Sequence, residues 1–179
     1  MFTSPASLTK PTFPVNVTMR STTREDAVTN DTMVTNGEYE QFINYGKEPY
    51  IYVGYIYNNW SEIYLNFSTT TAPANPTKAE ICLVFSSMSV PFEMNVSLVT
   101  QPWVETALTW NGKPDYGPSI ATMEIASTDV TYKVDVTDYI ATGSSFSVCL
   151  NASGPSETGY GRLYSHESTE PEAPGARLV

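Results

Sequence analysis

Short runs of alternating apolar and polar residues occupy most of the chain, and Gly, Pro, Asn and Ser separate these runs. Because successive side chains of a strand point to opposite faces of a sheet, this alternation predicts strands. No long stretch repeats with the helical period. The predicted strands are residues 13–20, 50–57, 62–67, 79–86, 92–99, 120–125, 130–136, 145–151, 161–165 and 176–179. Their spacing predicts an all-β fold, either a sandwich or a barrel.

The chain of 179 residues has the size of one domain and contains no internal repeat. Residues 1–24 form an extension ahead of the predicted domain, residues 25–179. The apolar positions of the extension alternate, and they are Phe13, Val15, Val17 and Met19. Two interpretations stay open: this run is the domain's own first strand, or it pairs with the open sheet edge of a neighbouring subunit. The second predicts a head-to-tail homo-oligomer that propagates without closing.

Charge and composition limit the partners of the protein. Charged residues make up 16% of the chain, the formal net charge is −10, and the isoelectric point is about 4.4. Such a surface repels nucleic acid and anionic lipid headgroups. No apolar run is long enough for a membrane span or for the core of a signal peptide. A surface rich in Ser and Thr is typical of secreted and cell-surface proteins, so an extracellular location is expected.

Six Asn-X-Ser/Thr sequons agree with an extracellular location. They are at Asn16, Asn30, Asn59, Asn66, Asn95 and Asn151. The asparagines at positions 16, 66, 95 and 151 lie out of phase with the apolar residues of their predicted strands, so their side chains are expected to face solvent. This placement predicts N-glycosylation. The alternative is that polar residues simply occupy polar faces.

The two cysteines, Cys82 and Cys149, also lie out of phase with the apolar residues of their predicted strands. Cysteines on the outer faces of neighbouring strands can form a disulfide, whereas buried free thiols more often belong to the apolar face. The pattern therefore predicts a Cys82–Cys149 disulfide and an oxidising compartment. Two unrelated free thiols are the alternative.

The segment WVETALTWNGKP contains two of the three tryptophans, Trp103 and Trp110. The Asn-Gly pair and the proline that follow are typical of a turn that closes a loop. In one interpretation, the tryptophans form a packing corner that pins this loop over the end of the sheet structure, with Glu105 as a polar partner. In the other, their ring faces stack on sugars.

The sequence does not predict catalysis. It has one histidine, His166, and it lacks a nucleophile elbow, an HExxH zinc motif and a phosphate-binding glycine loop. We therefore expect no enzymatic activity and predict no catalytic cofactor. His166 is expected to be a structural residue at the end of a strand.

Several short motifs follow one another between Glu25 and Val179. They are Glu25-Asp26-Ala27, Asn44-Tyr45-Gly46, Ile51-Tyr52-Val53-Gly54, Ile63-Tyr64-Leu65-Asn66-Phe67, Ala79-Glu80-Ile81-Cys82-Leu83, Trp103-Val104-Glu105, Leu108-Thr109-Trp110-Asn111, Val134-Asp135-Val136-Thr137 and Leu163-Tyr164-Ser165-His166-Glu167. In these motifs and their order, the chain resembles the DNRLRE-type domains, which are secreted jelly-roll modules related to carbohydrate-binding modules. The chain departs from that pattern at Ser68, where Asp is usual, and at His166, where Arg or Lys is usual.

The resemblance implies an antiparallel β-sandwich of the jelly-roll type over residues 25–179. Modules of this type often hold a structural Ca²⁺, which takes about 6–8 oxygen ligands. Candidate ligands near the ends of predicted strands are Glu25, Asp26, Asp129 and Asp135. The alternative is that these four are solvated surface acids.

The sequence favours two alternative functions. The N-terminal extension, the low charge and the sequons favour a non-catalytic cell-surface structural protein. Its subunits would assemble into an extracellular filament or layer by strand exchange from the N-terminal segment. The family resemblance instead favours a carbohydrate-binding module or adhesin that recognises a polysaccharide.

Overall fold

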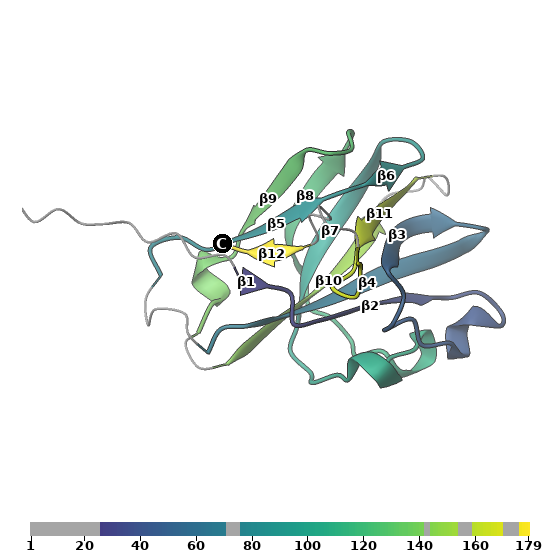
Figure 1. Cartoon of the computed structure of the whole chain (residues 1–179), viewed down its shortest axis with the longest axis horizontal. Helices are drawn as coiled ribbons and strands as arrows, with labels where there is room; N and C mark the ends of the chain where they lie inside the picture. Colours follow the sequence, from purple (N-terminus) through teal and green to yellow (C-terminus); the bar gives the residue numbers. More distant parts are fainter. Residues whose placement is uncertain (1–25, 71–75, 142–143, 154–158, 170–175) are drawn as a thin grey trace, which may run out of the picture.

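The computed structural model describes residues 26–70, 76–141, 144–153, 159–169 and 176–179. It consists of two antiparallel sheets (Figure 1). The larger sheet contains, in spatial order, β6 (Ser87–Met88), β11 (Tyr160–Tyr164), β3 (Tyr50–Ile56), β4 (Asn59–Ser68), β10 (Ser145–Ser153), β7 (Phe92–Val99) and β8 (Ser119–Ile125), and β2 (Asn30–Thr35) pairs with β4 beside this path. The smaller sheet contains β1 (Asp26–Ala27), β12 (Arg177–Leu178), β5 (Glu80–Val84) and β9 (Thr131–Asp135). The helical elements of the described residues are 3-10 turns: η1 (Glu40–Phe42), η2 (Glu105–Ala107), η3 (Trp110–Gly112) and η4 (Thr137–Tyr139).

The inner faces of the two sheets share one apolar core, which confirms the predicted β-sandwich. The larger sheet contributes Leu65 and Val148 among others, and the smaller sheet contributes Ile81 and Leu83. The alternation of apolar and polar residues produces this core, because every second residue of these strands is apolar and faces the opposite sheet. Each fully buried aliphatic side chain contributes roughly 2 kcal/mol, so this core is the main source of stability.

Most predicted strands of the described region are present, with their ends shifted by a few residues. For example, the 62–67 run is part of β4, which starts at Asn59, and the 130–136 run contains β9. The alternation does not predict β2 or β6. The predicted strand 13–20 lies outside the described residues, together with its apolar positions Phe13, Val15, Val17 and Met19.

The outer face of the larger sheet carries a second apolar cluster, next to the loop that joins β7 to β8. Its buried members are Val34, Tyr64, Val99, Leu108 and Cys149. Trp103 and Trp110 pack against this cluster, and each keeps part of its surface exposed. The rings of Trp103 and Tyr64 meet edge to face, with their centroids 6.0 Å apart. Both tryptophans therefore pack on the sheet, as the first interpretation expects, while their exposed parts leave the sugar-stacking interpretation open.

The predicted Cys82–Cys149 disulfide is wrong, because both cysteines are buried free thiols. Cys82 lies on β5 and Cys149 on β10, so they belong to different sheets. Their immediate neighbours along the strands belong to the core between the sheets, so the two thiols point to opposite outer faces. Sheets pack about 10 Å apart, whereas a disulfide tolerates roughly 7 Å between Cα atoms. The out-of-phase positions of the two cysteines did not indicate solvent exposure, because both side chains are covered on the outer faces of their sheets as well.

We expect neither thiol of the folded protein to react with an aromatic disulfide reagent at about pH 8. Burial, together with the Glu62 carboxylate, raises the pKa of the Cys149 thiol well above its ordinary value, so little reactive thiolate is present. Cys82 is protected by burial. The coloured product should correspond to no thiol before unfolding in denaturant and to both thiols afterwards. A thiol that reacts in the folded state, or a missing thiol after unfolding, would contradict this arrangement.

Candidate functional site

A groove of about 480 Å³ opens on the outer face of the larger sheet, beside the loop that joins β7 to β8. Its floor is a row of directly paired residues on four strands. These residues are Asn30 on β2, Asn66 on β4, Ser147 on β10 and Val99 on β7. The strand register therefore places two amides and a hydroxyl group side by side on one surface.

The aromatic residues that line the groove are Trp103 from the loop, Tyr139 from η4 and the buried Phe146 of β10. Tyr139 is 44% exposed. The turn that presents it is fixed by Asp135, whose Oδ1 accepts hydrogen bonds from the Thr137 backbone N–H (2.9 Å) and hydroxyl group (2.6 Å). Trp103 also lines a second depression of about 280 Å³, which it shares with Lys113. This tryptophan is thus part of both hollows on this face.

Hydrogen bonds fix the polar groups of the groove floor. The Asn66 Nδ2 donates to Thr29 Oγ1 at 3.1 Å, and the Ser147 hydroxyl donates to Asn66 Oδ1 at 2.7 Å. The described residues that line the groove include no formally charged side chain. Fixed amide and hydroxyl groups beside aromatic rings suit a polar, uncharged ligand.

A largely buried ion pair holds the loop against the sheet. The Lys113 Nζ donates to Glu62 Oε2 on β4 and lies 3.6 Å from the centroid of the Trp110 ring. The Tyr116 hydroxyl donates to the other Glu62 oxygen at 3.1 Å. Burial, and then the charge of Glu62, raises the pKa of Tyr116 above its ordinary value. The phenol therefore stays protonated as a hydrogen-bond donor at neutral pH.

Further hydrogen bonds tie the loop to the rest of the domain. The Asn44 Nδ2 donates to the backbone carbonyls of Glu105 and, at 2.8 Å, of Leu108. The Tyr64 hydroxyl donates to the Pro114 carbonyl at 3.1 Å. Together with the ion pair, these contacts fix the position of the segment that carries the groove tryptophan.

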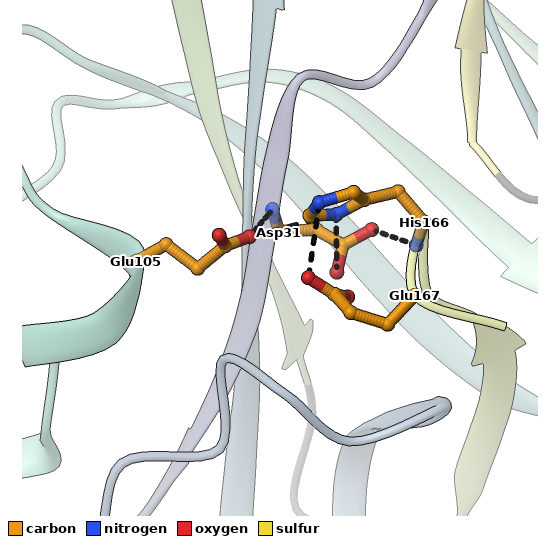
Figure 2. A group of neighbouring side chains, drawn as sticks. All are labelled: Asp31, Glu105, His166 and Glu167. Atoms are coloured by element: carbon orange, nitrogen blue, oxygen red, sulfur yellow. Dashed lines mark hydrogen bonds and ion pairs between the residues drawn. The ribbon is translucent and has the colours of Figure 1, made fainter.

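Four titratable side chains converge where η2 of the same loop meets β2 (Figure 2). They are Asp31 on β2, Glu105 on η2, and His166 and Glu167 after β11. The His166 Nδ1 lies 3.5 Å from Asp31 Oδ1 and 3.5 Å from Glu105 Oε1. The His166 Nε2 lies 2.9 Å from Glu167 Oε1. Carboxylate oxygens and imidazole nitrogens are metal ligands, so this cluster is a candidate metal centre.

Asp31 is the buried member of the cluster and is 1% exposed. Its Oδ2 accepts a hydrogen bond from the His166 backbone N–H at 2.8 Å, and its own backbone N–H donates to Glu105 Oε1 at 2.8 Å. Its Oδ1 is buried and has no hydrogen-bond partner among the described residues. Burial is the main cause that raises the pKa of Asp31 to about 7; the charges of Glu167 and Glu105 add to this rise, and His166 opposes it.

The structure does not bring together those candidate calcium ligands whose side chains it describes. Asp129 lies in the turn between β8 and β9, with φ at 58°, whereas Asp135 ends β9 and accepts hydrogen bonds from Thr137 of η4. Glu25 and the side chain of Asp26 lie outside the described part of the chain. The calcium prediction therefore stays a prediction. The cluster around Asp31 was not predicted, because no local motif joins residues that strand pairing brings together from distant segments.

The predicted glycosylation sites occupy several settings. Asn30 and Asn66 line the groove, so a glycan on either would compete with a ligand there. Asn95 pairs with Asn151 across β7 and β10, and the Asn151 Nδ2 is buried without a hydrogen-bond partner among the described residues. Because Nδ2 carries the glycan, Asn151 would have to turn outward to be modified. Asn59 starts β4, and Asn16 lies outside the described residues. Glycosylation stays a prediction at all six sites.

No helix within the described ranges is long and apolar enough to cross a membrane.

Comparison with known proteins assigns the chain to a family. Comparison with curated proteins finds no match. The family model for carbohydrate-binding module family 96 matches residues 22–178, which is nearly the whole chain. The predicted relationship to carbohydrate-binding modules is confirmed, while the narrower DNRLRE assignment stays a prediction. The chain belongs to carbohydrate-binding module family 96.

Proposed function

We propose that this protein is a non-catalytic module that binds a neutral polysaccharide in the groove beside Trp103. The observation that carries the proposal is the composition of that groove, in which aromatic rings border a floor of fixed amides and hydroxyl groups. Membership of a family of carbohydrate-binding modules supports the ligand class. It also supports a binding role rather than catalysis.

The chemistry of the groove matches that of a sugar ring. A pyranose presents C–H groups on its faces, which pack on aromatic rings, and hydroxyl groups on its rim, which pair with amides. Trp103 and Tyr139 can supply the first kind of contact, and Asn30, Asn66 and Ser147 the second. Since the lining described here is uncharged and the chain has a net charge of −10, a neutral glycan is favoured over an acidic one.

The location outside the cell is part of this proposal. Polysaccharides of cell walls and matrices are extracellular, and the sequons suit the same compartment. The self-assembling filament is less well supported, because it depends on residues 1–24, which lie outside the described residues. No contact described here favours it over the binding module.

Replacing Tyr139 with alanine should weaken binding to a neutral polysaccharide by about 2 kcal/mol, or roughly 30-fold, as is usual when a central aromatic contact is removed. Trp103→Ala should have a similar effect. The matched control is Tyr57→Ala, since Tyr57 is 88% exposed in the turn between β3 and β4 and does not line the groove. Binding can be measured by affinity electrophoresis in gels that contain glucans, mannans or galactans, with alginate and pectin as acidic comparisons.

The protein for this experiment should come from a host that adds no N-glycans, so that Asn30 and Asn66 stay free. Because Trp103 also packs on the second apolar cluster, the melting temperature of each variant must be recorded. Tyr139 lies outside both apolar clusters and gives the cleaner result. Equal retardation of wild type and Tyr139→Ala, or preferential binding of the acidic polysaccharides, would contradict the proposal.

A further inference from the structure

The cluster of Asp31, Glu105, His166 and Glu167 has no role in the proposed groove, and none of these residues lines it. The three carboxylates approach one another around one histidine. Among the described residues, the ion pairs of these carboxylates all go to His166. Carboxylates at this spacing repel one another in a partly buried site when they are ionised, and a bound cation would offset that repulsion.

We propose that Asp31, Glu105 and His166 bind a divalent transition-metal ion of the zinc class. The proposed ligand atoms are Asp31 Oδ1, Glu105 Oε1 and His166 Nδ1, and the four residues of the cluster can each offer one ligand atom such that all four atoms lie within 4.8 Å of one another. Bonds of about 2.1 Å in a tetrahedral arrangement place neighbouring ligand atoms ~3.4 Å apart. The Nδ1 lies 3.5 Å from both oxygens, so two of the three edges already have the required length.

One carboxylate oxygen of Asp31 is buried and directed into the cluster. Its Oδ2 is satisfied by the His166 backbone N–H, but its Oδ1 has no hydrogen-bond partner among the described residues, although the side chain is buried. A buried carboxylate oxygen without a partner costs folding free energy. This oxygen faces the His166 Nδ1, and the ion would lie between these two atoms (Figure 2). An ion at this point would satisfy it.

Glu167 orients the histidine in this arrangement. Its Oε1 lies 2.9 Å from His166 Nε2, the ring nitrogen that does not face Asp31. Histidines that bind metals commonly donate their other N–H to a carboxylate, which fixes the tautomer and the direction of the ring. The Glu167 pairing therefore leaves a lone pair on Nδ1 for the ion. The His166 side chain is 32% exposed, which gives the ion a path from solvent.

The ligand set favours zinc over calcium. Calcium takes about 6–8 oxygen ligands, whereas this cluster offers an imidazole nitrogen and few oxygens. Imidazole with carboxylates suits zinc and its neighbours among the transition metals. The fourth position is left for water. This site is therefore different from the structural calcium site predicted from the sequence.

The test uses the full-length, untagged protein after removal of metal with a chelator. Calorimetric titration with zinc chloride should show one tight site, and cobalt chloride should give the visible absorption bands of a tetrahedral ion. His166→Gln should weaken zinc binding by at least about 10-fold and abolish the cobalt bands. This variant keeps the backbone N–H that bonds to Asp31, and the side chain is partly exposed, so it should fold. Glu105→Gln is a second ligand variant in case it does not.

The control variant is Glu124→Gln, since Glu124 is an exposed carboxylate on β8 that takes no part in the cluster. It should bind zinc as the wild type does. Zinc should also raise the melting temperature of the wild type and of Glu124→Gln, but not of His166→Gln. Absence of zinc binding to the wild type, unchanged binding to His166→Gln, or tighter binding of calcium than of zinc would each overturn the proposal.

Discussion

Replacing Gly54 with alanine should lower the free energy of unfolding by about 3–4 kcal/mol. Gly54 lies in β3 with φ at +109°, a conformation that costs other residues roughly 1–2 kcal/mol. A Cβ atom at this position would lie 2.3 Å from the Gly159 carbonyl oxygen and 2.8 Å from the Tyr160 Cα. Both contacts are with backbone atoms, so the strand pairing itself must shift, at a further cost of roughly 1–3 kcal/mol.

Thermal unfolding of the wild type and of Gly54→Ala measures this loss of stability. For a domain of this size, the loss corresponds to a fall in melting temperature of about 10 °C. The matched control is Gly117→Ala, because a Cβ there meets nothing nearer than the Leu98 carbonyl oxygen at 3.8 Å. That variant should melt within a few degrees of the wild type. If both alanine variants melt together, the close approach between β3 and the start of β11 is not a determinant of stability.

The second large effect is expected at Lys113, whose ammonium group pairs with Glu62 under the loop that joins β7 to β8. Lys113→Met should lower the free energy of unfolding by about 2–3 kcal/mol, because it leaves a buried carboxylate without its cation. The side chains of Lys113 and Glu62 are 19% and 10% exposed, so solvent screens the pair only partly. The same variant should also weaken polysaccharide binding, because the loop positions Trp103 beside the groove.

A comparison of paired substitutions separates charge from packing. Lys78→Met removes a lysine from a surface ion pair with Glu80, in which Lys78 is 63% exposed, so solvent screens the pair and little change in stability is expected. The double variant Lys113→Met with Glu62→Gln should recover part of the stability that Lys113→Met loses, because the uncompensated charge is gone. Denaturant unfolding gives these free energies. A double variant less stable than Lys113→Met alone would show that the carboxylate was not the cause.

The class of fold could be predicted because it depends on local alternation. Every second residue is apolar from Phe92 to Leu98 in β7 and from Phe146 to Ala152 in β10, and that phase packs in the core between the sheets. Any sheet that buries one face must follow this pattern. The pattern does not state which strands become neighbours, so the groove floor, a row across β2, β4, β10 and β7, could not be predicted from it.

The strand β2 shows why the cluster around Asp31 was missed. Asp31 and Thr32 are adjacent, polar and both buried, at 1% and 0% exposed, which removes any alternation from this segment. Burial of Asp31 is tolerated because His166 and Glu105 form hydrogen bonds with it from distant segments. Local rules often fail where a sequence serves a site rather than a core. The prediction that Cys149 lies on an exposed face was wrong for a related reason, because the second apolar cluster covers the outer face of β10.

The pairing of β1 with β12 determines how the domain responds to tension. Asp26 pairs with Leu178 and Ala27 with Arg177 in antiparallel register, so the start of β1 lies beside the end of β12 (Figure 1). Force applied between these two points loads one residue pair at a time and opens the strands like a zipper, instead of shearing all their hydrogen bonds together. The groove floor belongs to the other sheet. Under such a load, the pairing between β1 and β12 therefore yields first, while the groove floor keeps its shape.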